Sequence, residues 1–210
     1  MATTADTLIT EVRRRRDDAT DEAYGDSVML DFLNDGCEIF ASTTGCCQHL
    51  ATVTPDGSNP YIALSTANLT YRHVIIYAVE YGTTVLDFAP LSEYKYKTAS
   101  SVAAPTCWTV WTVGGVERMY FDTIPATTSD VSIYFTYIPD TLTAVSSNVD
   151  IPERWHPAIK AYMQYRVDDL NREASLADRS YAEFEQLRQQ AANINESLLS
   201  WGGYTRPEGK

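Results

Sequence analysis

The chain has 210 residues, 44% of them hydrophobic and 21% charged, a composition that excludes a disordered or fibrous protein and suits one domain or two modest ones. Its 16 lysines and arginines against 28 aspartates and glutamates give a net charge of −12, which argues against a groove that grips nucleic acid by neutralising phosphates. The longest apolar stretch, residues 74–79, is far shorter than the roughly 20 residues of a membrane span, and residues 1–20 lack the apolar core of a signal peptide. We therefore expect a soluble protein that is not exported.

The first 47 residues predict two helices. Residues 7–18 place apolar side chains at helical spacing and carry four arginines, at positions 13–16, in their second half, and cations favour a helix C-terminus. A second helix is expected to begin after Asp26 or Ser27. We expect residues 34–36, Asn-Asp-Gly, to disturb it, because these types are common where helices end.

From about residue 48 the sequence becomes rich in Thr, Val, Ile and Tyr, with turn signals at short intervals. Residues 107–113 and 116–123 flank Gly114-Gly115 and predict a hairpin, since glycines supply the positive φ of a tight turn. Residues 131–137 alternate apolar and amphipathic side chains, which predicts a half-buried strand. Residues 71–79 and 83–88 are further predicted strands.

After Ile151-Pro152 apolar residues recur every three or four positions, which predicts a helix. Another is expected to begin at Ser175 or Asp178 and to pack against the first as an antiparallel pair. From Ser200 onward glycines and a proline oppose a regular helix.

Together these elements predict an α+β fold: a helical bundle from N- and C-terminal helices with an inserted antiparallel β domain. The expected segments are the N-terminal helices of the bundle (1–47), the β domain (48–150), the C-terminal helices (151–199) and an extended C-terminal tail (200–210).

A possible metal site would draw on Cys37, Cys46, Cys47, Cys107 and His49, because thiolates and imidazoles suit zinc. The spacing opposes it, since no C-x-x-C pair is present and adjacent cysteines do not easily face one ion. Without an export signal disulfides are not expected. We predict no metal and no cofactor, and leave open whether the cysteines are free thiols.

Catalytic motifs are missing from the sequence: there is no G-x-S-x-G, P-loop, G-x-G-x-x-G or H-E-x-x-H pattern. His49, His73 and His156 are too scattered to define an acid-base site, and packing or capping roles are favoured for them. Asp168 and Asp169 are consecutive on a helix and are expected at the surface. We therefore predict that the protein is not an enzyme.

Two further features allow alternative interpretations. The arginines at 13–16 are either a phosphate-contacting patch or a solvated helix end paired with nearby acids, and the second is favoured. The 14 tyrosines and four tryptophans indicate either a Tyr-rich core or an interface, since amphipathic aromatics are enriched at interfaces.

Several stretches resemble the head-to-tail adaptor (connector) proteins of tailed bacteriophages. The first covers residues 8–18, Leu-Ile-Thr-Glu-Val-Arg-Arg-Arg-Arg-Asp-Asp, and residues 24–36, which end in Leu-Asn-Asp-Gly. Residues 119–125 leading into 133–139 resemble a strand-Pro-strand unit of that family. Residues 151–162, continuing to 182–184, resemble its return into the helical bundle.

The resemblance implies a structural protein that forms a ring of about twelve copies under the portal, extends the DNA exit channel and provides the platform for tail attachment. Implied partners are the portal and a tail or nozzle protein, with DNA passing through without specific binding and no membrane contact. The implied location is the neck of the virion, with the host cytoplasm during assembly.

Trp201, Tyr204 and Arg206 are predicted to bind the portal, because aromatic and arginine anchors are favoured at interfaces. An alternative function is a neck or tail module that recognises a glycan or receptor through its aromatic-rich β domain. A third, an enzyme using the Cys and His cluster, has little support.

Overall fold

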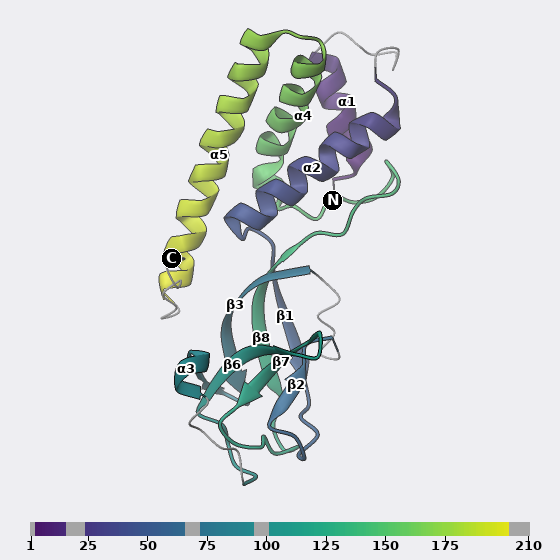
Figure 1. The fold of residues 1–210 in the computed structure, drawn as a ribbon. Helices are drawn as coiled ribbons and strands as arrows, with labels where there is room; N and C mark the ends of the chain where they lie inside the picture. The colour runs from purple at the N-terminus through teal and green to yellow at the C-terminus, as the bar shows by residue number, and fades with distance from the viewer. Residues whose placement is uncertain (1–2, 16–23, 66–71, 95–100, 202–210) are drawn as a thin grey trace. The chain divides into compact units, whose positions relative to one another are not determined.

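A computed structural model describes residues 3–15, 24–65, 72–94 and 101–201 of the chain (Figure 1). The described residues of Met1–Cys47 and Tyr137–Gly203 form one compact unit, here called the helical unit. Those of Gln48–Thr136 form a second, the β unit. The predicted α+β fold, with β structure inserted between helices from both ends of the sequence, is confirmed.

Helix α1, Ala5–Arg15, buries one apolar stripe, made of Leu8, Ile9 and Val12. The first amides of a helix lack partners within the helix. Here the amides of Ala5 and Asp6 donate to the carbonyls of Ser147 and Val145 at 2.9 and 2.8 Å. A distant segment of the chain therefore caps this helix.

Helix α2, Asp26–Thr44, runs without interruption through residues 34–36 and ends at Gly45, whose φ is 59°. The predicted disturbance is wrong, because these polar and small residues serve tertiary contacts. A β-carbon on Gly36 would lie 3.0 Å from Cδ1 of Tyr162, so glycine lets that ring approach the helix. Asn34 bonds the backbone of Leu142.

The C-terminal helices are α4, His156–Leu170, preceded by the 3₁₀ turn η1, Glu153–Trp155, and α5, Ala174–Trp201. They pack as the predicted antiparallel pair (Figure 1). Helix α5 includes Ser200 and Trp201, two residues of the segment expected as an extended tail.

Aromatic side chains form the centre of the helical unit. The Phe40 ring on α2 lies 5.8 Å from Trp155 and 6.3 Å from Phe184, measured between ring centroids. Tyr162 lies 5.1 Å from Phe184. Because Phe40 and Phe184 are fully buried, these rings join α2, α4 and α5 in one core.

One sheet of the β unit has the strand order β1-β8-β3-β4. Its strands are β1, Gln48–Val53; β3, Arg72–Tyr81; β4, Thr84–Val85; and β8, Val131–Ile138. Val131, Ile133 and Phe135 of β8 are fully buried and Ser132 and Tyr134 are partly exposed, so the predicted alternation is confirmed as far as Phe135. Thr136, which was expected on the more exposed face, is fully buried as well.

The second sheet has the order β2-β7-β6-β5. Its strands are β2, Tyr61–Ala63; β5, Asp87–Phe88; β6, Cys107–Val113; and β7, Val116–Phe121, and the short helix α3, Leu91–Tyr94, follows β5. The predicted β6–β7 hairpin is confirmed, with φ of 61° and 79° at Gly114 and Gly115. The two-residue strand β5 pairs parallel to β6, whereas the other pairs of this sheet are antiparallel.

Candidate functional site

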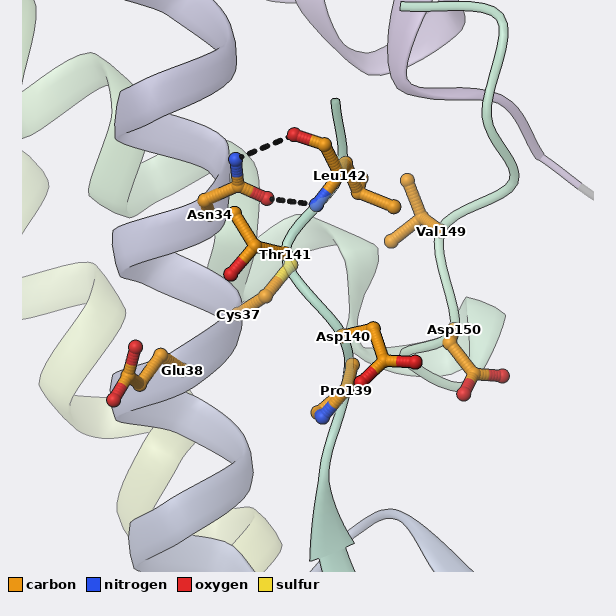
Figure 2. Close-up of a pocket in the computed structure, with 9 residues that line it drawn as sticks. All are labelled: Asn34, Cys37, Glu38, Pro139, Asp140, Thr141, Leu142, Val149 and Asp150. Carbon is orange, nitrogen blue, oxygen red and sulfur yellow. Dashed lines mark hydrogen bonds between the residues drawn. The ribbon is translucent and has the colours of Figure 1, made fainter. Parts of the chain in front are cut away.

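A small pocket lies in the helical unit between α2 and the segment of residues 139–150 (Figure 2). Asn34 holds this segment in place: its Nδ2 donates to the Leu142 carbonyl at 3.0 Å, and its Oδ1 accepts from the Leu142 amide at 2.9 Å. The cavity measures about 10 Å³, room for roughly one water molecule. The geometry is that of a structural anchor, because a larger ligand does not fit.

Three carboxylates, those of Glu38, Asp140 and Asp150, border this pocket. Figure 2 shows Glu38 on the opposite side from Asp140 and Asp150. Asp150 accepts a hydrogen bond of 2.6 Å from the Tyr137 hydroxyl. In the part of the chain that is described, no three His, Cys, Asp or Glu side chains are arranged to hold a metal ion.

All four cysteines are buried and reduced. The sulfur atoms of Cys46 and Cys47 are 3.7 Å apart. Their hydrogen bond, in which either sulfur can be the donor, raises the pKa of Cys47 and lowers the pKa of Cys46, while burial further raises that of Cys47. Burial raises the pKa of Cys37 to about 12. Cys37 and Cys47 are therefore neutral thiols at physiological pH and poor nucleophiles.

The histidines have structural contacts where they are described. His49 packs edge-on against the Phe135 ring, with 5.6 Å between centroids. The Nε2 atom of buried His156 lies 2.9 Å from the Ile151 carbonyl oxygen. The side chain of His73 lies outside the described residues. These contacts suit packing and capping better than acid-base chemistry.

Arg13 is buried and donates to the Asp26 carboxylate at 2.9 Å and to the Tyr24 carbonyl at 2.7 Å. This arginine therefore joins α1 to the start of α2 and is not part of a phosphate-binding surface. Arg14 and Arg15 are exposed. Arg16 and the acids of residues 17–22, which were expected to pair with these arginines, lie outside the described residues.

Asp168 is buried, which corrects the expectation that it lies at the surface; Asp169 is exposed as expected. The two carboxylate oxygens of Asp168 accept hydrogen bonds from Gln164 at 3.2 Å and from Ser180 of α5 at 3.0 Å. These donors make burial of the carboxylate tolerable. Asp168 thus connects α4 to α5 near their shared turn.

Sequence reasoning missed Asn195, a buried residue within the apolar stripe of α5. Its Nδ2 donates to the Thr44 carbonyl at 2.8 Å, which satisfies an acceptor in the last turn of α2. The sequence signal for a buried hydrogen bond was a polar residue among the apolar positions of α5. Its partner, Thr44, lies 151 positions away in the sequence and could not be identified from that signal.

Of the predicted portal-binding residues, Trp201 is the last residue of α5, and its side chain is outside the described residues. Tyr204 and Arg206 also lie outside them. The predicted portal-binding residues therefore start at the last residue of α5.

One face of the β2-β7-β6 sheet carries three aromatic rings and one guanidinium. We call this surface, made of Tyr61, Tyr120, Trp111 and Arg118, the aromatic face. Tyr120 lies 5.5 Å from Tyr61 and 6.2 Å from Trp111 between ring centroids. Arg118 lies 4.4 Å above Tyr61. Trp111 is 50% exposed, whereas Trp108 and Trp155 are buried. The tryptophans therefore serve both the core and the surface.

The comparison with known families finds a match that covers nearly the whole chain. A family model described as SU10 adaptor protein matches residues 3–207, and no curated protein matches the sequence. No helix in the described ranges is long and apolar enough to cross a membrane. Membership of a phage adaptor family implies a structural, non-enzymatic role in the virion, in contact with other virion proteins. The chain belongs to the SU10 adaptor protein family of phage structural adaptors.

Proposed function

We propose that this adaptor is a head-to-tail connector: copies form a ring of about twelve beneath the portal, extend the DNA exit channel and present a platform for the tail. The observation that carries this proposal is the family match over residues 3–207, which includes both the helical unit and the β unit. The pocket of Figure 2 is too small for a ligand larger than water, which is consistent with a role in assembly.

The charge of the chain suits a channel. Each copy carries −12, so a ring concentrates negative charge around its axis. DNA phosphates are repelled by such a lumen at distances below about 8–10 Å, beyond which physiological salt screens the interaction. DNA then slides through without being held.

The test is assembly with the portal protein encoded by the same phage. Purified chain and portal are mixed, separated by size and imaged by negative-stain electron microscopy. We expect complexes that carry a second ring on the tail-facing side of the portal. Chain that never co-purifies with the portal or with a tail protein would overturn the connector role.

The portal contact is proposed to involve Trp201, Tyr204 and Arg206. Because α5 extends to Trp201, the sharper deletion removes residues 202–210 and leaves the helix intact. We expect this deletion to weaken portal binding and to leave the thermal unfolding of the protein unchanged. Substitution of Asp178, an exposed residue on α5, by Asn is the matched control. Unaltered portal binding by the deleted chain would refute the contact at Tyr204 and Arg206.

The alternative, a glycan-binding module, draws on the aromatic face. Half-exposed Trp111 is suited to stacking on a sugar ring, whereas Arg118 already covers Tyr61. A glycan array separates the two functions: specific binding that is lost in Trp111→Ala would favour the module, and the connector predicts none.

A further inference from the structure

The edge of strand β6 is open along half its length. β6 and β7 are joined by a two-residue turn, so Val113 and Val116 exchange backbone hydrogen bonds, as do alternate pairs further along the hairpin. The backbone groups of Trp108, Val110 and Thr112 consequently point to the other side of β6. The Trp108 carbonyl is used there, since it accepts from the Ala89 amide at 2.8 Å.

Beyond Trp108 this edge has no neighbouring strand in the described part of the chain. β5 pairs only with Cys107 and Trp108. Among the described residues nothing bonds the outward amides and carbonyls of Val110 and Thr112. Thr112 is exposed and Val110 is partly exposed, so another strand can reach these groups.

The composition of β6 offers none of the usual protection of an edge strand. Its sequence, Cys-Trp-Thr-Val-Trp-Thr-Val, contains no charge, proline or glycine. Natural proteins protect exposed edges with such residues or cover them, because a bare β-prone edge pairs with other chains. An uncharged edge of this kind is consistent with one that is covered in the assembled particle.

Exposed apolar side chains extend the same surface. Trp111, Val113 and Val116 are 50%, 37% and 37% exposed. These three side chains share one face of the hairpin, since Val113 lies opposite Val116 and side chains two positions apart point the same way. A strand added at the edge would therefore meet both open backbone groups and apolar area.

Charge indicates which partner fits. Two copies of a chain with net charge −12 repel one another least where their contact surface is uncharged, as along β6. Arg118, opposite Trp111 on β7, does not charge this edge, because its guanidinium lies over the Tyr61 ring of β2, on the far side of β7.

We propose that the open edge of β6, at Val110 and Thr112, accepts an extended segment from a second copy of this chain, and that Trp111, Val113 and Val116 pack against that copy. The added segment continues the sheet through main-chain hydrogen bonds. The proposal rests on the proposed connector function, because it assigns the contact by which neighbouring copies join, but its test does not require the portal.

The main test replaces Thr112 by Pro, which removes the outward amide and leaves the hydrogen bonds between β6 and β7 intact. Thr112→Ser keeps the amide and is the matched control. Molar mass is measured by light scattering over a range of concentrations. We expect the parent chain and Thr112→Ser to self-associate, and Thr112→Pro to associate about tenfold more weakly per lost hydrogen bond.

Hydrogen exchange of the parent chain provides a second measurement if Thr112→Pro fails to fold, as judged by circular dichroism. We expect the amides of Val110 and Thr112 to become protected as the concentration rises and the chain associates. Protection of these two amides that does not change with association would overturn the proposal.

Two other outcomes also refute the β6 contact: equal association of folded Thr112→Pro and the parent chain, and a parent chain that stays monomeric throughout. Portal binding, measured separately, distinguishes this failure from failure of the connector role. A chain that pairs through β6 but binds no virion protein would refute the connector role alone.

Discussion

The helical unit and the β unit solve the problem of buried polar groups in different ways. The buried charged and amide side chains that are described, Arg13, Asp168 and Asn195, all lie in the helical unit, and each has a hydrogen-bond partner. Among the described residues of the β unit, the buried polar side chains are those of two threonines, Thr109 and Thr136. Buried charged and amide side chains thus connect distant segments of the helical unit, whereas in the β unit such connections come from hydroxyl groups, as from Tyr81 to Ala126 and from Tyr94 to Phe121.

This difference also affects where partners can bind. Backbone groups inside a helix are satisfied by the helix itself, and the start of α1 and the end of α2 are capped by other segments. A sheet can leave an edge unpaired, as β6 does at Val110 and Thr112. The β unit is therefore the better candidate for contacts made through the backbone.

The largest expected effect separates the two cores. Phe184→Ala removes a fully buried ring from the helical unit, and Phe135→Ala does the same in the β unit. Each should lower the free energy of unfolding by about 3–5 kcal/mol. Hydrogen exchange should show lost protection mainly in the substituted unit. Equal loss in both units would show that they unfold as one.

A somewhat smaller effect is expected at Gly36, where the Tyr162 ring leaves no room for a side chain. Gly36→Leu should destabilise the helical unit by about 1–3 kcal/mol, because Tyr162 is itself held against Phe184. Thermal unfolding measures the change. Gly25→Ala is the control, since open space surrounds a β-carbon there. A neutral Gly36→Leu would mean that the Tyr162 ring moves aside.

The polar anchor at Asn34 should contribute a similar or smaller amount. Asn34→Ala removes both hydrogen bonds to Leu142, at a cost of about 1–2 kcal/mol. The Leu142 amide should then exchange faster with solvent, while exchange in the β unit stays unchanged. Asn34→Asp keeps only the acceptor and should give an intermediate exchange rate. Unchanged exchange at Leu142 would contradict the anchoring role.

The smallest effect concerns pH and the β unit. Burial raises the pKa of Tyr94 to about 12 from its ordinary value of 10.0, and its hydroxyl donates to the Phe121 carbonyl at 2.7 Å. The folded state thus retains the proton more firmly than the unfolded state. The stabilisation is fully present below pH 10 and is lost as pH rises towards 12.

Tyr94→Phe lacks this proton and this hydrogen bond. The difference in unfolding free energy between the parent chain and Tyr94→Phe should be largest below pH 10 and should shrink above it. Denaturant titrations at several pH values measure the difference. A difference that stays constant with pH would contradict the raised pKa.

Local periodicity was sufficient to predict the hairpin at Gly114-Gly115 and the alternating burial of β8 as far as Phe135. A two-residue glycine turn and a two-residue alternation are properties of the strand backbone itself, so they can be recognised without any partner. The antiparallel pairing of α4 and α5 could be predicted for a similar reason, because a short connection joins two amphipathic helices.

Polar residues inside helices were misread because their partners are far away in sequence. Asn and Gly are common where helices end, but Asn34 and Gly36 lie inside α2. There Asn34 forms a hydrogen bond with the Leu142 backbone, and Gly36 leaves room for the Tyr162 ring. Aspartate is usually a surface residue, but Asp168 can be buried because Ser180 and Gln164 donate hydrogen bonds to its carboxylate. A local sequence pattern shows that a polar or small residue is present, but it does not show which distant donor or aromatic ring contacts that residue.

The amino-acid sequence by itself determined the order of two helices, a β region and two further helices, the hairpin of β6 and β7, and the resemblance to phage adaptors. These follow from backbone periods and turn residues, which act over a few positions. Only the tertiary structure decided which polar side chains are buried, that the pocket beside Asn34 is an anchor, and that β6 keeps an open edge. Those outcomes depend on which distant segments lie side by side, and the free energy of burying a polar group or leaving a strand unpaired is set by that neighbour.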